Sequence, residues 1–167
     1  MSDKTLPCAS DFMNVHVHCV SMKMPLAEVI HTLDRYKISD VPVVDETQGE
    51  RHLVGLLSEQ DCLAALANEV FFGMPATPQT AETMMRRHPV SVSADTDLFA
   101  LASIFVSHGY RQLPVVSGET LLGVVSRRDI LHALNEYYMK RQAEQERIHH
   151  PPDLKDIFSH RFLVSGN

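Results

Sequence analysis

Two Ser-x-x-Asp motifs lie in similar surroundings along the chain, at Ser58 to Asp61 and at Ser126 to Asp129. Serine is a good helix N-cap, and an acidic residue three positions later suits the positive end of the helix dipole. A helix N-terminus also offers free N–H groups that can bind an anion such as phosphate. The motifs therefore allow two interpretations, helix capping and ligand binding, and the motif alone favours capping.

Both motifs are parts of an internal duplication. Residues 37–63 and 109–131 each read as a strand, a turn, a second strand and the start of a helix. Pro42 corresponds to Pro114 (114 − 42 = 72), and Asp61 corresponds to Asp129 (129 − 61 = 68). The difference of four residues falls in the hairpin turn, where an insertion costs least. We therefore treat the chain as two copies of one unit.

Each copy also contains a strand and an amphipathic helix before its hairpin. A short strand is expected near His18 to Val20, and Pro25 suits the first turn of the helix that follows. Asp95 or Thr96 is available to cap the equivalent helix of the second copy. The apolar helical stripes are Leu26, Val29, Ile30, Leu33; Leu98, Leu101, Ala102, Phe105; Leu63, Leu66, Val70; and Ile130, Leu131, Leu134, Tyr138. The predicted fold class is α/β (α+β), with two β-α-β-β-α repeats.

The composition of the chain excludes several classes of protein. It has 167 residues, 44% of them hydrophobic, and a net charge of −6, so there is no basic footprint for nucleic acid. No apolar run approaches the ~20 residues that span a bilayer, and the first residues lack a signal-peptide core. Cys8, Cys19 and Cys62 are odd in number and scattered, which favours a reducing, cytoplasmic location.

The predicted boundaries follow from the duplication. They are 9–70 for repeat 1, 71–80 for a linker, 81–138 for repeat 2 and 139–167 for a helical extension and tail. Repeats of this size are marginal alone, so we expect them to share a core. The linker residues Phe71, Phe72 and Met74 are apolar enough to pack on the module. The tail turn with Leu154, Ile157 and Phe158 is predicted either to dock or to remain solvated.

This arrangement resembles a tandem pair of cystathionine-β-synthase (CBS) domains, a Bateman module, over about residues 9–138. The residues that carry the resemblance are Val41-Pro42-Val43-Val44, Leu113-Pro114-Val115-Val116, Gly55-Leu56-Leu57-Ser58-x-x-Asp61 and Gly123-Val124-Val125-Ser126-x-x-Asp129. The resemblance implies two α/β units about a pseudo-two-fold axis, with a cleft between them that often holds adenine nucleotides. It implies a regulatory role, and the chain is similar to stand-alone members.

The resemblance also implies ligand-binding residues. Ser58, Asp61, Ser126 and Asp129 would contact ribose, and Ser39, Arg111 and Arg128 would approach phosphate. Adenine would lie against Val17 and His18 with Val124 in one cleft, and against Pro89 and Val90 with Leu56 in the other. Ile38 and Tyr110 would close these slots. His18 departs from the small apolar residue common at its position, which is unfavourable for adenine there.

The two clefts are predicted to differ in charge. The cleft with Ser58 and Asp61 would contain Arg128 and possibly Arg111, whereas the other cleft would face Asp40 and Gln60. Phosphorylated nucleotides are therefore expected to prefer the Asp61 cleft.

A rival chemistry lies in Val15-His16-Val17-His18-Cys19. Alternation places His16 and His18 on one face of a strand as a possible metal pair, but the spacing supplies no third ligand. No paired carboxylates, nucleophile elbow or glycine-rich phosphate loop indicate an enzyme.

The sequence thus favours a non-catalytic sensor of an adenosyl ligand, an adenine nucleotide or S-adenosylmethionine, with no required cofactor or metal. The expected partners are a second copy of the chain and an unidentified regulated protein, without nucleic acid or membrane. Apolar residues that a second chain could cover are Tyr137, Tyr138, Met139, Phe71 and Phe72. The alternatives are an interaction module with a vestigial cleft and a metal- or redox-responsive protein that uses His16, His18 and Cys19.

Overall fold

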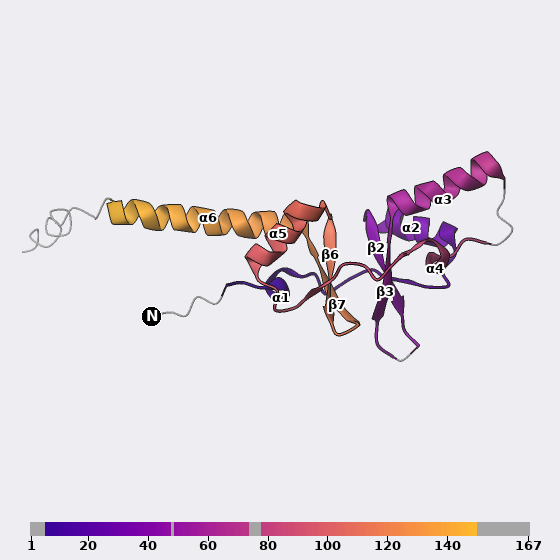
Figure 1. The fold of residues 1–167 in the computed structure, drawn as a ribbon, viewed down its shortest axis with the longest axis horizontal. Helices are drawn as coiled ribbons and strands as arrows, with labels where there is room; N and C mark the ends of the chain where they lie inside the picture. The colour runs from indigo at the N-terminus through magenta and orange to yellow at the C-terminus, as the bar shows by residue number, and fades with distance from the viewer. Residues whose placement is uncertain (1–5, 48, 74–77, 150–167) are drawn as a thin grey trace, which may run out of the picture. The chain divides into compact units, whose positions relative to one another are not determined.

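The computed structural model describes residues 6–47, 49–73 and 78–149 (Figure 1). Repeat 1 contains β1 (Val20–Ser21), α2 (Leu26–Tyr36), β2 (Asp40–Asp45), β3 (His52–Ser58) and α3 (Glu59–Phe72). Repeat 2 contains β5 (Val92–Ser93), α5 (Leu98–His108), β6 (Gln112–Ser117), β7 (Thr120–Ser126) and α6 (Arg127–His149). Three short elements precede these sets, α1 (Ala9–Phe12), α4 (Ala81–Met84) and β4 (Arg86–Arg87). The predicted β-α-β-β-α order is confirmed in both repeats.

The chain forms two compact units, Met1–Ile130 and a second that begins at Leu131 inside α6. The first unit holds one mixed sheet with the order β1-β2-β3-β7-β6-β5, and β4 pairs with β3. In each repeat the hairpin strands are antiparallel and the short first strand is parallel to its neighbour. The hairpins meet where His52 pairs with Thr120. Equivalent residues therefore lie about a pseudo-two-fold axis.

The two repeats exchange their first segments. The N–H of Leu98 donates to the carbonyl of Pro7, and the N–H of Ala9 donates to the carbonyl of Thr96. The equivalent residues of the other repeat, 72 positions away, make the same contacts. The N–H of Leu26 donates to the carbonyl of Gln79, and the N–H of Ala81 donates to the carbonyl of Met24. The α1 segment thus packs at the start of α5, and the α4 segment at the start of α2. Each repeat completes the other, as expected for units this small.

The core follows the predicted stripes of α2 and α5. The predicted stripe of α6 is only partly correct, because Ile130 is buried whereas Leu131 and Tyr138 are 66% and 58% exposed. Leu26, Val29 and Leu33 of α2 are buried with Val41, Val43 and Leu57 of the hairpin, and Ala81 and Met85 of the exchanged segment join the same cluster. Leu98, Leu101 and Phe105 of α5 are buried in repeat 2. Burial of each such side chain stabilises the fold by about 1.5–3 kcal/mol.

The helix that follows the first hairpin differs from the prediction. In α3 the buried residue is Cys62, whereas Leu63 and Val70 of the predicted stripe are 67% and 77% exposed. Phe71 and Phe72 end this helix and are also exposed, so the expectation that they pack on their own chain is wrong. Only the side of α3 that carries Cys62 packs against the core, and the predicted apolar stripe is largely exposed to solvent.

Smaller differences concern element boundaries. The cap of α5 is Asp97, whose Oδ1 accepts hydrogen bonds from the N–H groups of Phe99 and Ala100, not Asp95 or Thr96. Asp95 instead accepts a hydrogen bond from the hydroxyl of Ser93 in the preceding turn. The first strand begins at Val20, and the last helix extends past Tyr138 as expected. Met74 and the tail turn at 154–158 lie outside the described residues.

Two hairpin glycines make room for the exchanged segments. A Cβ on Gly123 would lie 2.8 Å from the carbonyl oxygen of Asn14, which is held in place by two backbone hydrogen bonds to Val124. A Cβ on Gly55 would instead meet the flexible side chain of Met85. We expect Gly123→Ala to reduce the free energy of unfolding by about 2–3 kcal/mol and Gly55→Ala by less, because backbone yields less easily than a methionine. Urea unfolding of both variants measures this, and an equal loss would contradict the argument.

Candidate ligand pocket

A pocket of about 720 Å³ is lined by residues from both repeats. Repeat 1 contributes the end of β3 and the start of α3, with Asp40 beside them. Repeat 2 contributes residues 86–90 and 108–113. This size is within the range of small-molecule sites.

The β3–β4 pairing creates one apolar wall. Leu56 pairs with Arg86, so the chain that follows β4 passes beside β3 and carries Pro89 and Val90 into the pocket. Tyr110 also lines the pocket, and it follows Gly109, which ends α5 in the left-handed conformation. The structure therefore gathers the adenine-slot residues Leu56, Val90 and Tyr110 in one pocket. Their contact with a ligand stays a prediction.

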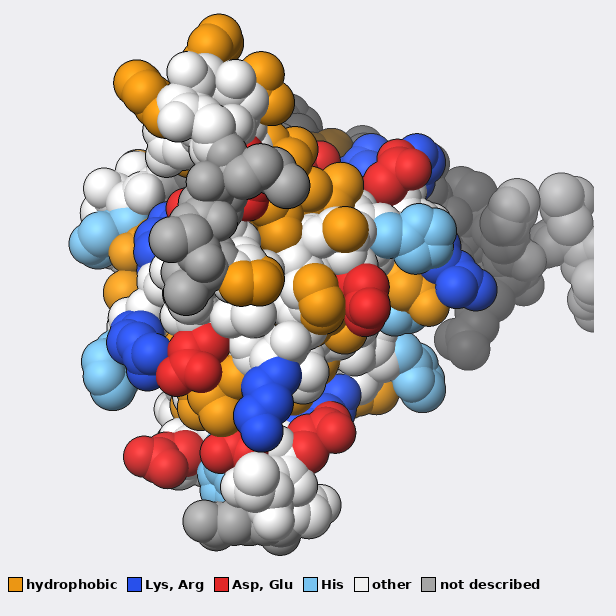
Figure 2. All heavy atoms as spheres, turned by 90° about the vertical axis from the view of Figure 1, so that its right-hand side faces the viewer, with side chains coloured by type: hydrophobic (Ala, Val, Ile, Leu, Met, Phe, Trp, Pro, Cys, Tyr) orange, Lys and Arg blue, Asp and Glu red, His pale blue; other side chains and the backbone are white. Residues whose placement is uncertain are grey.

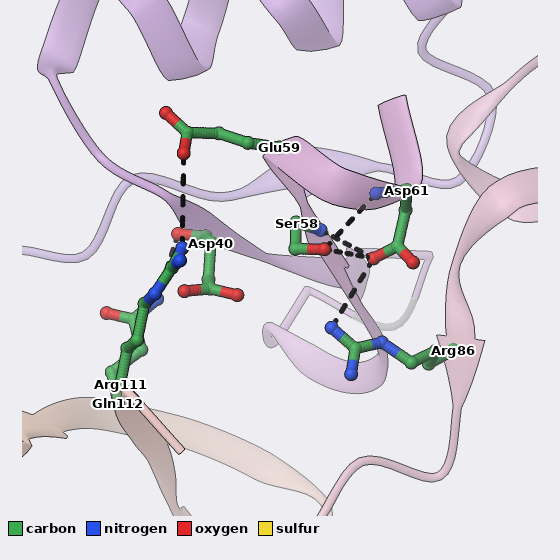
Figure 3. A network of polar contacts seen from close by, with 7 residues as sticks. All are labelled: Asp40, Ser58, Glu59, Asp61, Arg86, Arg111 and Gln112. Carbon is green, nitrogen blue, oxygen red and sulfur yellow. Dashed lines mark hydrogen bonds and ion pairs between the residues drawn. The ribbon is translucent and has the colours of Figure 1, made fainter. Parts of the chain in front are cut away.

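The Ser58 and Asp61 pair caps α3. Asp61 Oδ2 accepts hydrogen bonds from the N–H of Ser58 at 2.8 Å and from its hydroxyl at 2.6 Å (Figure 3). Ser126 and Asp129 repeat this arrangement at α6, with distances of 3.1 and 2.5 Å. The capping interpretation is confirmed at both motifs, and a role in ligand binding remains a prediction.

Asp61 pairs with an arginine of the pocket lining but is not itself part of that lining. Arg86 Nη2, from the lining, is 3.4 Å from Asp61 Oδ2. Asp61 itself lines a neighbouring pocket of about 540 Å³ with α3 residues and Met84. Because the ion pair is long and Arg86 is exposed, the side chain of Arg86 is easy to displace. Once the Arg86 side chain moves, a ribose could reach Asp61. Every hydrogen bond and ion pair described for Asp61 uses Oδ2 or its backbone N–H, and Oδ1 remains available.

The pocket cations are only partly those expected. Arg111 lines the pocket and its Nη1 is 3.9 Å from Glu59 Oε2. Arg86 and Arg87 also line it, and sequence reasoning did not select them. The available signal was Arg86-Arg87 in repeat 2 at the positions of Asn14-Val15 in repeat 1. The remaining phosphate candidates, Arg128 and Ser39, do not line this pocket.

Asp40 and Gln60 were assigned to the wrong cleft. Both line the same pocket as Ser58 and Arg111. The reason for Asp40 is strand register, because Asp40 pairs with Ser58 across the β2–β3 hairpin. Burial raises the pKa of the Asp40 carboxyl, although the nearby guanidinium groups of Arg111 and Arg86 oppose this shift.

The second set of predicted residues is separate from this pocket. Val124 pairs with Asn14 as Leu56 pairs with Arg86, which brings Val17 and His18 to the equivalent position. There the ring of His18 stacks on Tyr36, with centroids 3.5 Å apart. Ligand contact by this set stays a prediction; its members are Val17, His18, Ile38, Val124, Ser126 and Asp129.

The metal alternative gains no additional ligand. Among the residues that the structure describes, no group of three or more His, Cys, Asp or Glu side chains could hold a metal ion. Burial raises the pKa of the Cys19 thiol, and the opposing charge is Arg51, whose Nη1 is 4.0 Å from Sγ.

Within the described ranges, no helix is long and apolar enough to cross a membrane.

The family model for the CBS domain matches residues 9–68 and 81–136. The chain therefore belongs to the CBS domain family and contains a tandem pair, which confirms the resemblance drawn from its sequence.

Similarity to individual proteins agrees with the family. The chain is 30% identical over 123 residues to an A-adding tRNA nucleotidyltransferase of Geobacter sulfurreducens, covering 74% of this chain but only 13% of that protein. It is 25% identical over 129 residues to Hypoxic response protein 1 of Mycobacterium tuberculosis, covering 77% of this chain and 86% of the relative. The solved structure of CBSX2 from Arabidopsis thaliana in complex with AMP superposes with a TM-score of 0.66 at 25% identity, covering 78% and 98% of the two chains.

Proposed function

We propose that this protein is a non-catalytic regulatory module that binds an adenosyl ligand between its two CBS repeats. The observation that carries the proposal is the pocket in which Leu56, Val90 and Tyr110 lie with Ser58 and Arg111. The structural similarity to CBSX2, which was solved with AMP, supports the class of ligand. The nucleotidyltransferase activity of the Geobacter relative is not carried over, because this chain spans a small part of that enzyme.

The charges around the pocket suggest how ligand binding would be transmitted. Two ion pairs join the repeats at the pocket, Arg86 with Asp61 and Arg111 with Glu59. A phosphate or ribose would compete for the same groups, so the ligand would exchange contacts between the repeats for contacts with itself. This exchange can change the state of a partner protein only if the two repeats have two relative arrangements and the ligand binds these arrangements with different affinities.

Identification of a co-purified small molecule tests this function. We expect mass spectrometry of the denatured protein to detect a released adenosyl compound, or calorimetry of the ligand-free protein to detect binding of adenosine or AMP. A protein that releases no such compound and binds neither probe would contradict the proposed function.

A second candidate is a module whose main role is association. The exposed apolar side chains of α3, Leu63, Val70, Phe71 and Phe72, favour it. Figure 2 shows apolar side chains at the top of its view, where the end of α3 lies. A homodimer formed through this surface is compatible with ligand binding. Sedimentation of the protein as a monomer at tens of micromolar would exclude the homodimer.

A further inference from the structure

The backbone of Asp40 is held in the wall of the pocket that the proposed function assigns to the ligand. Asp40 pairs with Ser58 in the β2–β3 hairpin, and Gln112 Nε2 of the other repeat donates to the Asp40 carbonyl at 2.8 Å. Figure 3 shows the Asp40 side chain between Arg111 and Ser58 with no dashed line to its carboxylate. Within the described part of the chain, no hydrogen bond or ion pair is made to these oxygens.

The pocket arginines are otherwise balanced by carboxylates. Arg86 is 3.4 Å from Asp61, and Arg111 is 3.9 Å from Glu59. Arg87 is 3.1 Å from Glu82. These three arginines are the Lys and Arg side chains of the described lining, so Asp40 adds a negative charge that none of these ion pairs uses.

The carboxylate of Asp40 is also partly removed from water. Its side chain is half-buried, and burial raises the pKa of its carboxyl. A half-buried carboxylate that accepts no hydrogen bond from the described residues has a strong effect on the preferred charge of a ligand placed beside it. It disfavours a phosphate and favours a cation.

We propose that Asp40 sets the charge preference of this pocket, against phosphorylated nucleotides and towards adenosyl ligands with a positive charge near the 5′ carbon. The sulfonium group of S-adenosylmethionine has this chemistry. The inference rests on the proposed function, because it assumes that the adenosyl ligand occupies this pocket. It makes Asp40 the residue that opposes the attraction of Arg111 for phosphate.

The test compares three probes on the full chain and on Asp40→Asn, which keeps the size of the side chain and removes its charge. Adenosine is neutral and should bind both proteins within about twofold. AMP should bind the variant about tenfold more tightly, and S-adenosylmethionine about tenfold more weakly, as expected for one charge removed several ångströms away. Titration calorimetry at neutral pH measures all three affinities.

The matched control is Asp34→Asn, which makes the same change in net charge on the exposed face of α2, outside the pocket. AMP and S-adenosylmethionine should keep their wild-type affinities there. Equal changes for all three probes in Asp40→Asn, or equal effects of the two variants, would overturn the role of Asp40 and leave the proposed function intact. If no probe binds either protein, both proposals fail. Binding of AMP to the Asp40→Asn variant but not to the wild-type protein would support the inference.

Discussion

If both clefts bind ligand, two phases of binding are expected, and Asp61→Ala should abolish the tighter one. The affinity for adenosine and for AMP in that phase should fall by at least about a hundredfold. A carboxylate that accepts both ribose hydroxyls makes two charge-assisted hydrogen bonds, each contributing about 1.5–3 kcal/mol. Asp61 Oδ2 is already used by Ser58, but Oδ1 is available for a sugar. Both ligands carry the same ribose, so both should be affected alike. Calorimetry with each ligand measures the effect.

Asp129→Ala is the matched control. Asp129 caps α6 through the same contacts that Asp61 makes at α3, so each variant loses a cap of about 1 kcal/mol. Asp129 lines neither the pocket that contains Ser58 nor the neighbouring pocket that Asp61 lines, and its removal should affect only a weaker phase of binding. Similar losses of the tighter phase in both variants would show that capping, and not ribose contact, explains the result. Thermal unfolding of the two proteins confirms that their stability changes match.

The duplication explains why so much of the fold could be predicted from one sequence. Two copies with Pro42 and Pro114 in equivalent strands constrain each other, because an element assigned in one copy must also suit the other. The stripes of α2 and α5 were therefore assigned correctly. The stripe of α3 was not, because helical periodicity shows that a face is apolar but not which partner covers it. That face is exposed in this chain.

The exchange of first segments between the repeats explains why some of the pocket residues could not be predicted from the sequence. Arg86 and Arg87 lie in a segment with no chemical motif, and they reach the pocket only because β4 pairs with the hairpin of the other repeat. Asp40 was assigned to the wrong cleft for a related reason, since its position depends on strand register. Motif spacing within one repeat cannot determine which segments of the two repeats meet. The Ser58 and Asp61 pair, in contrast, is local and was recognised.

Arg111→Ala should weaken AMP binding by about ten- to a hundredfold and change adenosine binding little. Arg111 lines the pocket beside Tyr110, and its long ion pair with the exposed Glu59 leaves it free to turn towards a phosphate. A hydrogen bond between arginine and phosphate contributes about 1.5–3 kcal/mol, which corresponds to this loss of affinity. Arg127→Ala is the control, because it removes the same charge from an exposed residue outside the pocket and should leave both ligands unaffected. Calorimetry decides the question. Equal losses for AMP and adenosine in Arg111→Ala would show that this side chain supports the pocket without contacting phosphate.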